Sequence, residues 1–286
     1  MEKLLPDQLK ALWQLVDGKQ LSPEQFHLEQ ERLLQEYQGL WQQALLLGGQ
    51  DDLQSSLCSE LAKYSGCEDL SEIRRRCSAA LSHVKDEWHG TVECNDHQSV
   101  EQFYNRSEAM IYELTWWHTL SDDSSPLAYV TALHFARLHG CKSYLDFGAG
   151  VGSGAILFAQ HGLEVTVADI SAAMLDFSRW RLALRDLPAH FVDLKESRLP
   201  DDAYDMVAAM DVFEHLVDPV KAVEELWQSM RSGGFLFGRF HSELDEDRPH
   251  HIVQDFGPTI RRLHSLGCVE VWRDEWLWGH QVFQKS

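Results

Sequence analysis

Four glycines at alternate positions mark residues 145–154, whose sequence is LDFGAGVGSG. Glycine lets a backbone turn tightly and still leave room for a ligand that lies against it. The turn follows an apolar segment that carries an acid, Asp146, and precedes the apolar run 155–159. That run begins a helix, whose first amide groups point back toward the turn. This order of strand, glycine turn and helix start predicts a cradle for a nucleotide-like ligand.

Three kinds of ligand compete for this cradle. A phosphate-binding P-loop ends in Gly-Lys-Ser/Thr, and residues 145–154 contain no lysine. A dinucleotide site requires G-x-G-x-x-G, and counting from Gly148 puts Ser153 in the place of the third glycine. The remaining candidate is S-adenosylmethionine (SAM), which has no pyrophosphate and carries an ammonium and a sulfonium group. Asp146, at the end of the first strand, suits such a cation.

Three further predicted strands also end in carboxylates. Residues 165–169 end at Asp169, residues 190–193 end at Asp193, and residues 205–211 end at Asp211. Ligands of open α/β sheets bind at the carboxyl ends of the strands, so these acids are expected to share one site. Asp169 is placed to hold both ribose hydroxyls, and Asp193 to accept from the adenine amino group. Together the acids favour SAM as the cofactor.

These motifs, with Asp169-Ile170-Ser171, the segment 211–215 (DVFEH) and Ser232-Gly233-Gly234, resemble class I SAM-dependent methyltransferases. They are similar to the small-molecule branch, which carries an EHL-x-DP segment after the fourth strand, and the resemblance covers roughly residues 99–286. It implies a set of cofactor-binding residues: Gly148, Ala149 and Gly150 along the methionine half, Asp211 and Val212 on the methionine side, Asp169 and Ile170 at the ribose and adenine, Asp193 and Leu194 at the adenine, and Met174.

The expected fold is a three-layer α/β sandwich with a seven-stranded, mostly parallel Rossmann-like sheet behind an all-α N-terminal cap. Segments 234–238, 269–272 and 281–283 supply the last three strands. The resemblance places the final strand antiparallel. The predicted domains are a helical cap over residues 1–95 and a SAM-binding catalytic domain over residues 96–286. The cap shows no motif with chemistry of its own, so we expect it to act as a lid or as the contact of a homodimer.

The segment that joins the two parts is rich in aromatic residues. Ser99 to Gln102 (SVEQ) predicts a capping-box helix start. By the resemblance, helices before the first strand cover the cofactor, and aromatic faces attract a sulfonium by ~0.5–2 kcal/mol where water is excluded. A buried stripe along the helix explains the same pattern. Arg106 is a candidate partner for the methionine carboxylate, and the aromatic candidates are Tyr104, Tyr112, Trp116, Trp117 and His118, with Trp116 assigned to the cofactor.

Acceptor chemistry is harder to assign. An oxygen or nitrogen acceptor often needs a base near neutrality, typically histidine. We take His215 after the fourth strand, His241 after the fifth and Tyr104 as catalytic candidates. Three histidines, His241, His250 and His251, with the acids between 243 and 247, could bind a metal, but their spacing fits no ligand pattern. No metal is predicted.

Composition limits the partners. A formal net charge of −20 repels nucleic-acid backbones and anionic membranes, so we expect neither as a partner. No apolar run approaches the ~20 residues of a membrane span, and the first residues lack a secretory pattern. The six cysteines form no C-x-x-C pair, and Cys94 with His97 lacks a second pair for zinc. A cytoplasmic location with reduced thiols is expected.

Three functions remain open at this point. The first is a SAM-dependent methyltransferase that acts on a small metabolite, which is our prediction. The second uses SAM as the substrate: the methionine amine attacks its own γ-carbon and yields azetidine-2-carboxylate and methylthioadenosine. Synthases of that amino acid share the fold and a helical N-terminal cap, which the helical start of this chain resembles. The third is a SAM-binding protein without catalysis.

Overall fold

The computed structural model describes residues 4–93, 96–242 and 245–286. The predicted domain boundary at residue 95, Cys94, and the acid at position 243 lie outside the described residues. Among the described helices, none combines the length and the apolar character needed to cross a membrane.

A seven-stranded sheet forms the centre of the molecule, with the strand order β3-β2-β1-β4-β5-β7-β6. Strands β1 to β5 pair in parallel, and β7 runs antiparallel to both β5 and β6, which confirms the predicted fold and the reversed last strand. The strands are β1 (Ser143–Phe147), β2 (Glu164–Asp169), β3 (His190–Asp193), β4 (Tyr204–Ala209), β5 (Met230–Arg239), β6 (Cys268–Arg273) and β7 (His280–Lys285).

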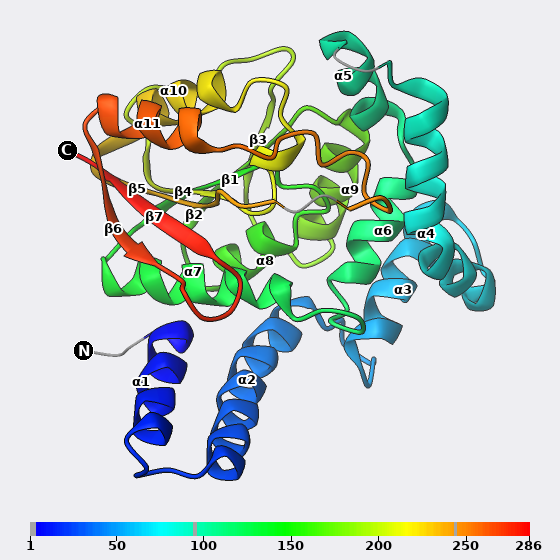
Figure 1. Cartoon of the computed structure of the whole chain (residues 1–286). Coiled ribbons are helices and arrows are strands. Elements are labelled where there is room, and N and C mark those ends of the chain that lie inside the picture. The colour runs from blue at the N-terminus through cyan, green and yellow to red at the C-terminus, as the bar shows by residue number, and fades with distance from the viewer. Residues whose placement is uncertain (1–3, 94–95, 243–244) are drawn as a thin grey trace.

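Helices cover both faces of this sheet (Figure 1). Because side chains alternate along a strand, Tyr144 and Met206 enter the core on one face while Leu145 and Val207 enter the core on the other. The first face is covered by α7 (Ala128–Leu138), which follows the short 3-10 helix η1 (Ser125–Leu127), by α8 (Ser153–Gln160) and by α9 (Ala172–Ala183). The second is covered by α10 (Pro219–Ser229) and α11 (Gly257–Ser265).

The N-terminal helices are continuous with this core. Helix α1 (Leu5–Asp17) and helix α2 (Pro23–Leu45) place apolar side chains in the same cluster as α7 and α8. Ser22 caps α2 in a complete capping box with Gln25, as the motif predicts. Helices α3 (Leu53–Ser65), α4 (Leu70–Thr91), α5 (His97–Arg106) and α6 (Ala109–Trp117) stand at one end of the sheet (Figure 1).

The predicted helix start at Ser99 is wrong. Helix α5 begins two residues earlier, and the carboxylate of Asp96 caps it by accepting from the backbone N–H groups of Gln98 and Ser99. The hydroxyl of Ser99 instead donates to backbone carbonyls, including that of Asp96 at 2.9 Å. Ser107 ends α5, so the aromatic segment forms two helices rather than one.

Candidate active site

The glycine turn lies between β1 and α8, with positive φ angles of +66° at Gly148 and +52° at Gly150. A Cβ atom on Gly148 would lie 2.7 Å from Cγ2 of Val212, and one on Gly150 would lie 2.8 Å from Cδ1 of Leu114. Atoms this close cannot coexist without displacement. The turn therefore has no room for side chains, because α6 and the segment after β4 lie directly against it.

Replacement of Gly148 by alanine is expected to damage the site more than a matched glycine change. Both Gly148 and Gly162 have positive φ, which costs an alanine ~1–2 kcal/mol, but a Cβ on Gly162 meets no atom within 4 Å. The contact with Val212 should cost Gly148→Ala a further ~1–3 kcal/mol. Urea unfolding of the two variants measures this difference. Calorimetry should show weaker SAM binding for Gly148→Ala alone. Equal losses of stability in the two variants would mean that the contact with Val212 has no effect.

Asp169, at the end of β2, organises the turn. Its Oδ2 accepts from the backbone N–H of Gly150 at 2.9 Å, and its Oδ1 accepts from that of Ser171 at 2.8 Å. Burial raises the pKa of this carboxyl group. Each oxygen keeps a further lone pair, so the carboxylate can accept two more hydrogen bonds from adjacent hydroxyl groups.

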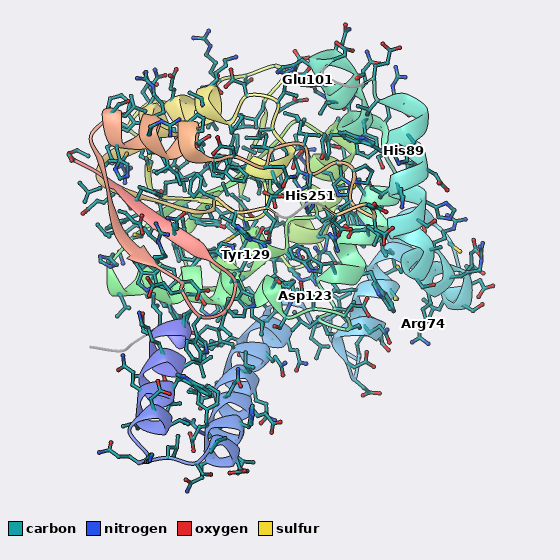
Figure 2. The ribbon with its side chains drawn as sticks, in the orientation of Figure 1. Arg74, His89, Glu101, Asp123, Tyr129 and His251 are labelled. Atoms are coloured by element: carbon teal, nitrogen blue, oxygen red, sulfur yellow. The ribbon has the colours of Figure 1, made fainter. Side chains whose placement is uncertain are left out.

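A cavity of about 650 Å³ opens at the carboxyl ends of the strands. The glycine turn and Asp169 lie on one side of it, and α5 and α6 form another. Figure 2 labels four lining residues that come from separate parts of the chain: Glu101 of α5, Asp123 after α6, Tyr129 of α7 and His251 before α11. Among the described residues, α1 to α4 contribute no side chain to this lining.

Most of the residues predicted from sequence come together around this cavity. The three catalytic candidates, Tyr104, His215 and His241, line it. So do most of the cofactor candidates, which are Gly148, Ala149, Gly150, Asp169, Ile170, Met174, Leu194, Asp211 and Val212.

Arg106 and Trp116 require correction. Arg106 is exposed at the end of α5 and does not line the cavity. The indole of Trp116 donates to Oδ2 of Asp122 at 2.9 Å, away from the lining, while the next two residues, Trp117 and His118, take its place there. A helix offers only one side to a cavity, so an aromatic run cannot direct all of its members inward.

Two predicted carboxylates lie beside the cavity without lining it. Asp146 is fully buried below the start of α8, where its Oδ2 lies 2.9 Å from the position of a Cβ on Gly154. Burial raises its pKa to about 7. Asp193 is half-buried at the end of β3 and accepts from the backbone N–H of Lys195 at 2.9 Å. In this conformation, neither carboxylate is part of the cavity lining.

Two buried glutamates on the cavity were missed by the sequence reasoning. Burial raises the pKa of Glu113 on α6, although the guanidinium of Arg248, 3.6 Å away, opposes this. Burial, followed by the charge of Asp211, raises the pKa of Glu214 to about 8. Glu214 belongs to the EHL motif, so its position was visible. Glu113 had only the weaker signal of an acid within an aromatic helix.

Asp211 adopts a backbone conformation that is unusual outside glycine, with φ of +47°. Such strain persists only where the surroundings hold it, and it is common at functional sites. Here Nη1 of Arg239, at the end of β5, donates to Oδ1 of Asp211 at 2.7 Å. The contact places a positive and a negative charge on the cavity beside the glycine turn.

Burial favours the neutral form of two cavity histidines. Burial lowers the pKa of His215 to about 4 and that of His118 to about 3. Burial also raises the pKa of Tyr104 well above its usual range, and its buried hydroxyl has no hydrogen-bond partner within the described chain. The ring of Tyr104 meets that of His215 edge-on, with centroids 5.9 Å apart.

A buried ion-pair network supports the glycine turn from behind. Arg181 of α9 is fully buried and donates from Nη1 to the carbonyl of Val151 at 2.6 Å and to the hydroxyl of Ser153 at 2.8 Å. Its Nε donates to Glu60 of α3 at 2.7 Å, and Arg185 donates to the same carboxylate. Helix α3 thus helps to hold the turn in place although it does not line the cavity.

The residues present fit SAM. The turn excludes side chains where the cofactor's methionine half would lie, and Asp169 keeps two acceptor sites for a ribose diol. Carboxylates surround the region that would hold the ammonium and sulfonium groups, with Asp211 and Glu214 on the cavity.

Comparison with known proteins agrees. Residues 145–236 match the model of a methyltransferase domain. A demethylmenaquinone methyltransferase of Clavibacter sepedonicus is 36% identical over 92 residues, which are 32% of this chain and 37% of that protein. A ubiquinone biosynthesis O-methyltransferase of Photorhabdus laumondii is 30% identical over 151 residues, 50% of this chain and 60% of that protein. The chain thus matches less than two thirds of the length of these relatives.

Among solved structures, a SAM-dependent methyltransferase of Leishmania major superposes with a TM-score of 0.52 and 16% identity, over 70% of this chain and 90% of that one. At this identity the likeness concerns the fold, which is the one described above. The matched domain and the residues around the glycine turn are similar to those of class I SAM-dependent methyltransferases, which supports SAM as the cofactor.

Proposed function

We propose that the protein transfers the methyl group of SAM to a small molecule bound in the same cavity. The observation that carries this proposal is the continuity of the cavity. The glycine turn and Asp169 lie at one side, and Tyr104, Glu113 and His215 line the same space. A volume of about 650 Å³ falls within the range of small-molecule sites, ~300–1,000 Å³.

The helices that line this space support the same reaction. SAM supplies an electrophilic methyl group on a sulfonium. The protein contributes alignment of the acceptor and exclusion of water, which are worth several kcal/mol in such displacements. Helices α5 and α6 serve this purpose, because they contribute Tyr104, Glu113 and Leu114 to the cavity beside the glycine turn. Leu114 lies close enough to contact any atom added to Gly150.

A hydroxyl group is the first acceptor to test. The Photorhabdus laumondii relative is an O-methyltransferase by name, and it matches half of this chain. The lining offers polar contacts to such an acceptor, since Tyr104, Arg248 and several histidines reach the cavity. Acidic residues outnumber Lys and Arg there, so a neutral or cationic acceptor fits better than a polyanion.

Incubation with SAM tests this proposal directly. The purified protein is given SAM alone, then SAM with a panel of hydroxylated aromatic and aliphatic compounds, and the adenosyl products are separated by mass spectrometry. We expect S-adenosylhomocysteine only when an acceptor is present. The methylated acceptor should be heavier by about 14 mass units, because a methyl group replaces a hydrogen atom. Methylthioadenosine with azetidine-2-carboxylate from SAM alone would overturn the proposal in favour of the cyclase. The Asp169→Asn variant is the matched control, since it should lose turnover with every acceptor.

A further inference from the structure

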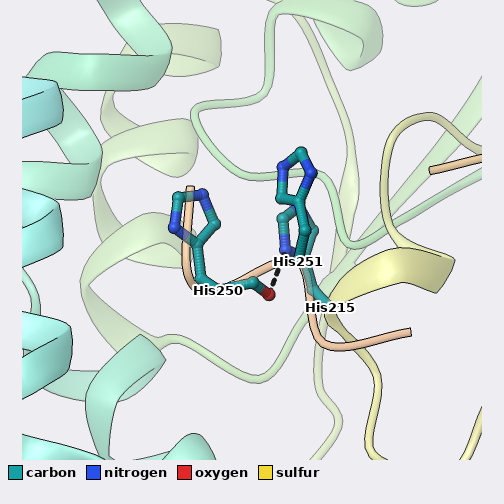
Figure 3. Close-up of side chains that lie close together, drawn as sticks. All are labelled: His215, His250 and His251. Carbon is teal, nitrogen blue, oxygen red and sulfur yellow. Dashed lines mark hydrogen bonds between the residues drawn. The ribbon is translucent and has the colours of Figure 1, made fainter. Parts of the chain in front are cut away.

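Three histidines from two distant segments meet at the cavity. His215 lies in the short 3-10 helix η2 (Phe213–His215) after β4, and His250 and His251 lie between β5 and α11. One ring nitrogen of each lies within 4.8 Å of the others, and Figure 3 shows the three rings gathered together. The sequence separates His215 from this pair by 35 residues, so spacing alone could not reveal the cluster.

The backbone holds the two histidine-bearing segments in register. The N–H groups of Ile252 and Val253 both donate to the carbonyl of Glu214, at 2.8 and 3.1 Å. Nδ1 of His215 lies 3.0 Å from the carbonyl oxygen of His250, the contact dashed in Figure 3. These bonds tie residues 214–215 to residues 250–253 independently of the imidazole rings.

The contact of His215 also defines its tautomer. A carbonyl oxygen only accepts, so Nδ1 carries the proton and Nε2 keeps a free lone pair. Metal-binding histidines usually donate their second ring N–H to a backbone carbonyl or carboxylate in this way, which orients the ring and raises its basicity as a ligand.

A buried ring nitrogen of the cluster points to a cation. His250 is 3% exposed, and its Nδ1 has no hydrogen-bond partner among the described residues. Buried polar atoms rarely lack a partner, so this nitrogen calls for an explanation. A cation bound by the nitrogen would supply the missing partner.

We propose that His215, His250 and His251 bind one divalent transition-metal ion in the acceptor half of the cavity. Imidazole nitrogen suits Zn²⁺, Fe²⁺, Ni²⁺ and Cu²⁺, and three protein ligands with an open fourth position are typical of catalytic zinc. Nitrogens on one tetrahedral ion lie about 3.3 Å apart, so binding draws the three together by up to about 1.5 Å through side-chain rotation. His251 is half-buried in an irregular segment, which permits this movement.

The nearest cation does not oppose the ion strongly. Arg248 precedes His250 by two residues, and its guanidinium lies 3.6 Å from Glu113 and 3.6 Å from Asp245. These two carboxylates offset its charge. Aromatic rings also pack against the cluster: the ring of Trp88 of α4 lies with its centroid 6.2 Å from that of His250, and the ring of Tyr104 of α5 lies 5.9 Å from that of His215.

The role of the ion in catalysis rests on the methyl transfer proposed above. A hydroxyl group that takes the open position loses its proton to water more readily, because the ion lowers its pKa. The oxygen then forms a bond to the methyl carbon as the bond from that carbon to sulfur breaks, and S-adenosylhomocysteine leaves. The acceptor class this implies is an alcohol or phenol that binds the ion through one oxygen.

Cobalt binding tests the site without reference to activity. Untagged protein is treated with a chelator, dialysed and titrated with CoCl₂ while visible absorption is recorded. We expect ligand-field bands that saturate at about one ion per chain and disappear when Zn²⁺ is added. His250→Gln and His251→Gln should weaken binding at least about a hundredfold, beyond the 10–100-fold typical of second-shell changes. His89→Gln, an exposed histidine on α4, should bind cobalt as the wild type does.

SAM calorimetry on the same samples separates the possible outcomes. Variants that bind SAM normally but not cobalt would establish the site on folded protein. Wild-type protein that binds SAM but shows no ligand-field bands, or bands that persist in the His250→Gln, His251→Gln double variant, would overturn the metal site and leave the proposed methyl transfer standing. Stoichiometric cobalt binding without methyl transfer to any acceptor would support the metal site and overturn the proposed methyl transfer.

Discussion

Replacement of Glu60 by glutamine is expected to lower the free energy of unfolding by about 3–5 kcal/mol. Glu60 and Arg181 are both fully buried, and their side chains are joined at 2.7 Å. The amide would leave the guanidinium of Arg181 buried without a negative partner. The free energy of unfolding of a native protein is about 5–15 kcal/mol, so this loss is a large share of it. Urea unfolding followed by circular dichroism measures the change.

Glu72→Gln is the matched control for this experiment. Glu72 also accepts from two arginines, Arg75 and Arg76, but on the exposed face of α4. Water screens such surface pairs, so the control should unfold at the urea concentration of the wild type. If Glu60→Gln did the same, the buried network would not stabilise the fold. We also expect the Glu60 variant to bind SAM more weakly, because Arg181 holds the carbonyl of Val151 in the glycine turn.

Asp169→Asn is expected to weaken SAM binding by at least about a hundredfold. The charged carboxylate is placed to accept both ribose hydroxyls, and hydrogen bonds to charged groups contribute about 1.5–3 kcal/mol each. At about 1.4 kcal/mol for each factor of ten, two such bonds correspond to two or more orders of magnitude. The amide keeps one acceptor oxygen and nearly the same shape, so the fold should survive. Isothermal calorimetry with SAM measures the dissociation constant.

The control for Asp169 is Asp176→Asn. Asp176 lies on α9, the helix that follows Asp169 in the chain. Its side chain is exposed and pairs with Arg179 at 2.7 Å. Its loss should leave SAM affinity unchanged. A decrease of less than tenfold in Asp169→Asn, with the circular dichroism spectrum of the wild type, would mean that this carboxylate does not hold the cofactor.

The sheet could be predicted because its signals are local. The first three strands are short runs that end at an acid or just before a glycine, with β2 ending at Asp169 and β3 at Asp193 as expected, and the structure has all seven predicted strands. The start of α2 was equally clear, since a capping box involves only residues three apart. The failure at Ser99 has a local cause too: Asp96, three residues earlier, accepts from the backbone N–H of Ser99 itself, so Ser99 lies inside the first turn of the helix and does not cap it.

What could not be predicted depends on residues far apart in the chain. Glu60 and Arg181 are separated by 121 residues, and neither lies in a recognisable motif. His215 and His250 meet only because the segment after β5 folds back over the end of β4. The prediction for the aromatic residues of the segment that joins the two parts failed for a different reason. Its composition indicated that aromatic rings reach the cavity, but the exact rotation of α6 decides that Trp117 lines it and Trp116 does not.

The buried contacts between the N-terminal helices and the cofactor turn limit how this protein can be divided or recombined. Among the described residues, those that line the cavity all lie within 96–286. A fragment with those limits would nevertheless keep Arg181 and Arg185 without Glu60. It would also lose Trp41, whose indole donates to the carbonyl of His118 at 3.0 Å and stacks on Tyr129. A chimaera that joins this catalytic part to a different helical region must therefore supply a buried carboxylate and an indole at the same places. The residues of the cavity come from one part of the chain, but a stable, working protein requires both parts.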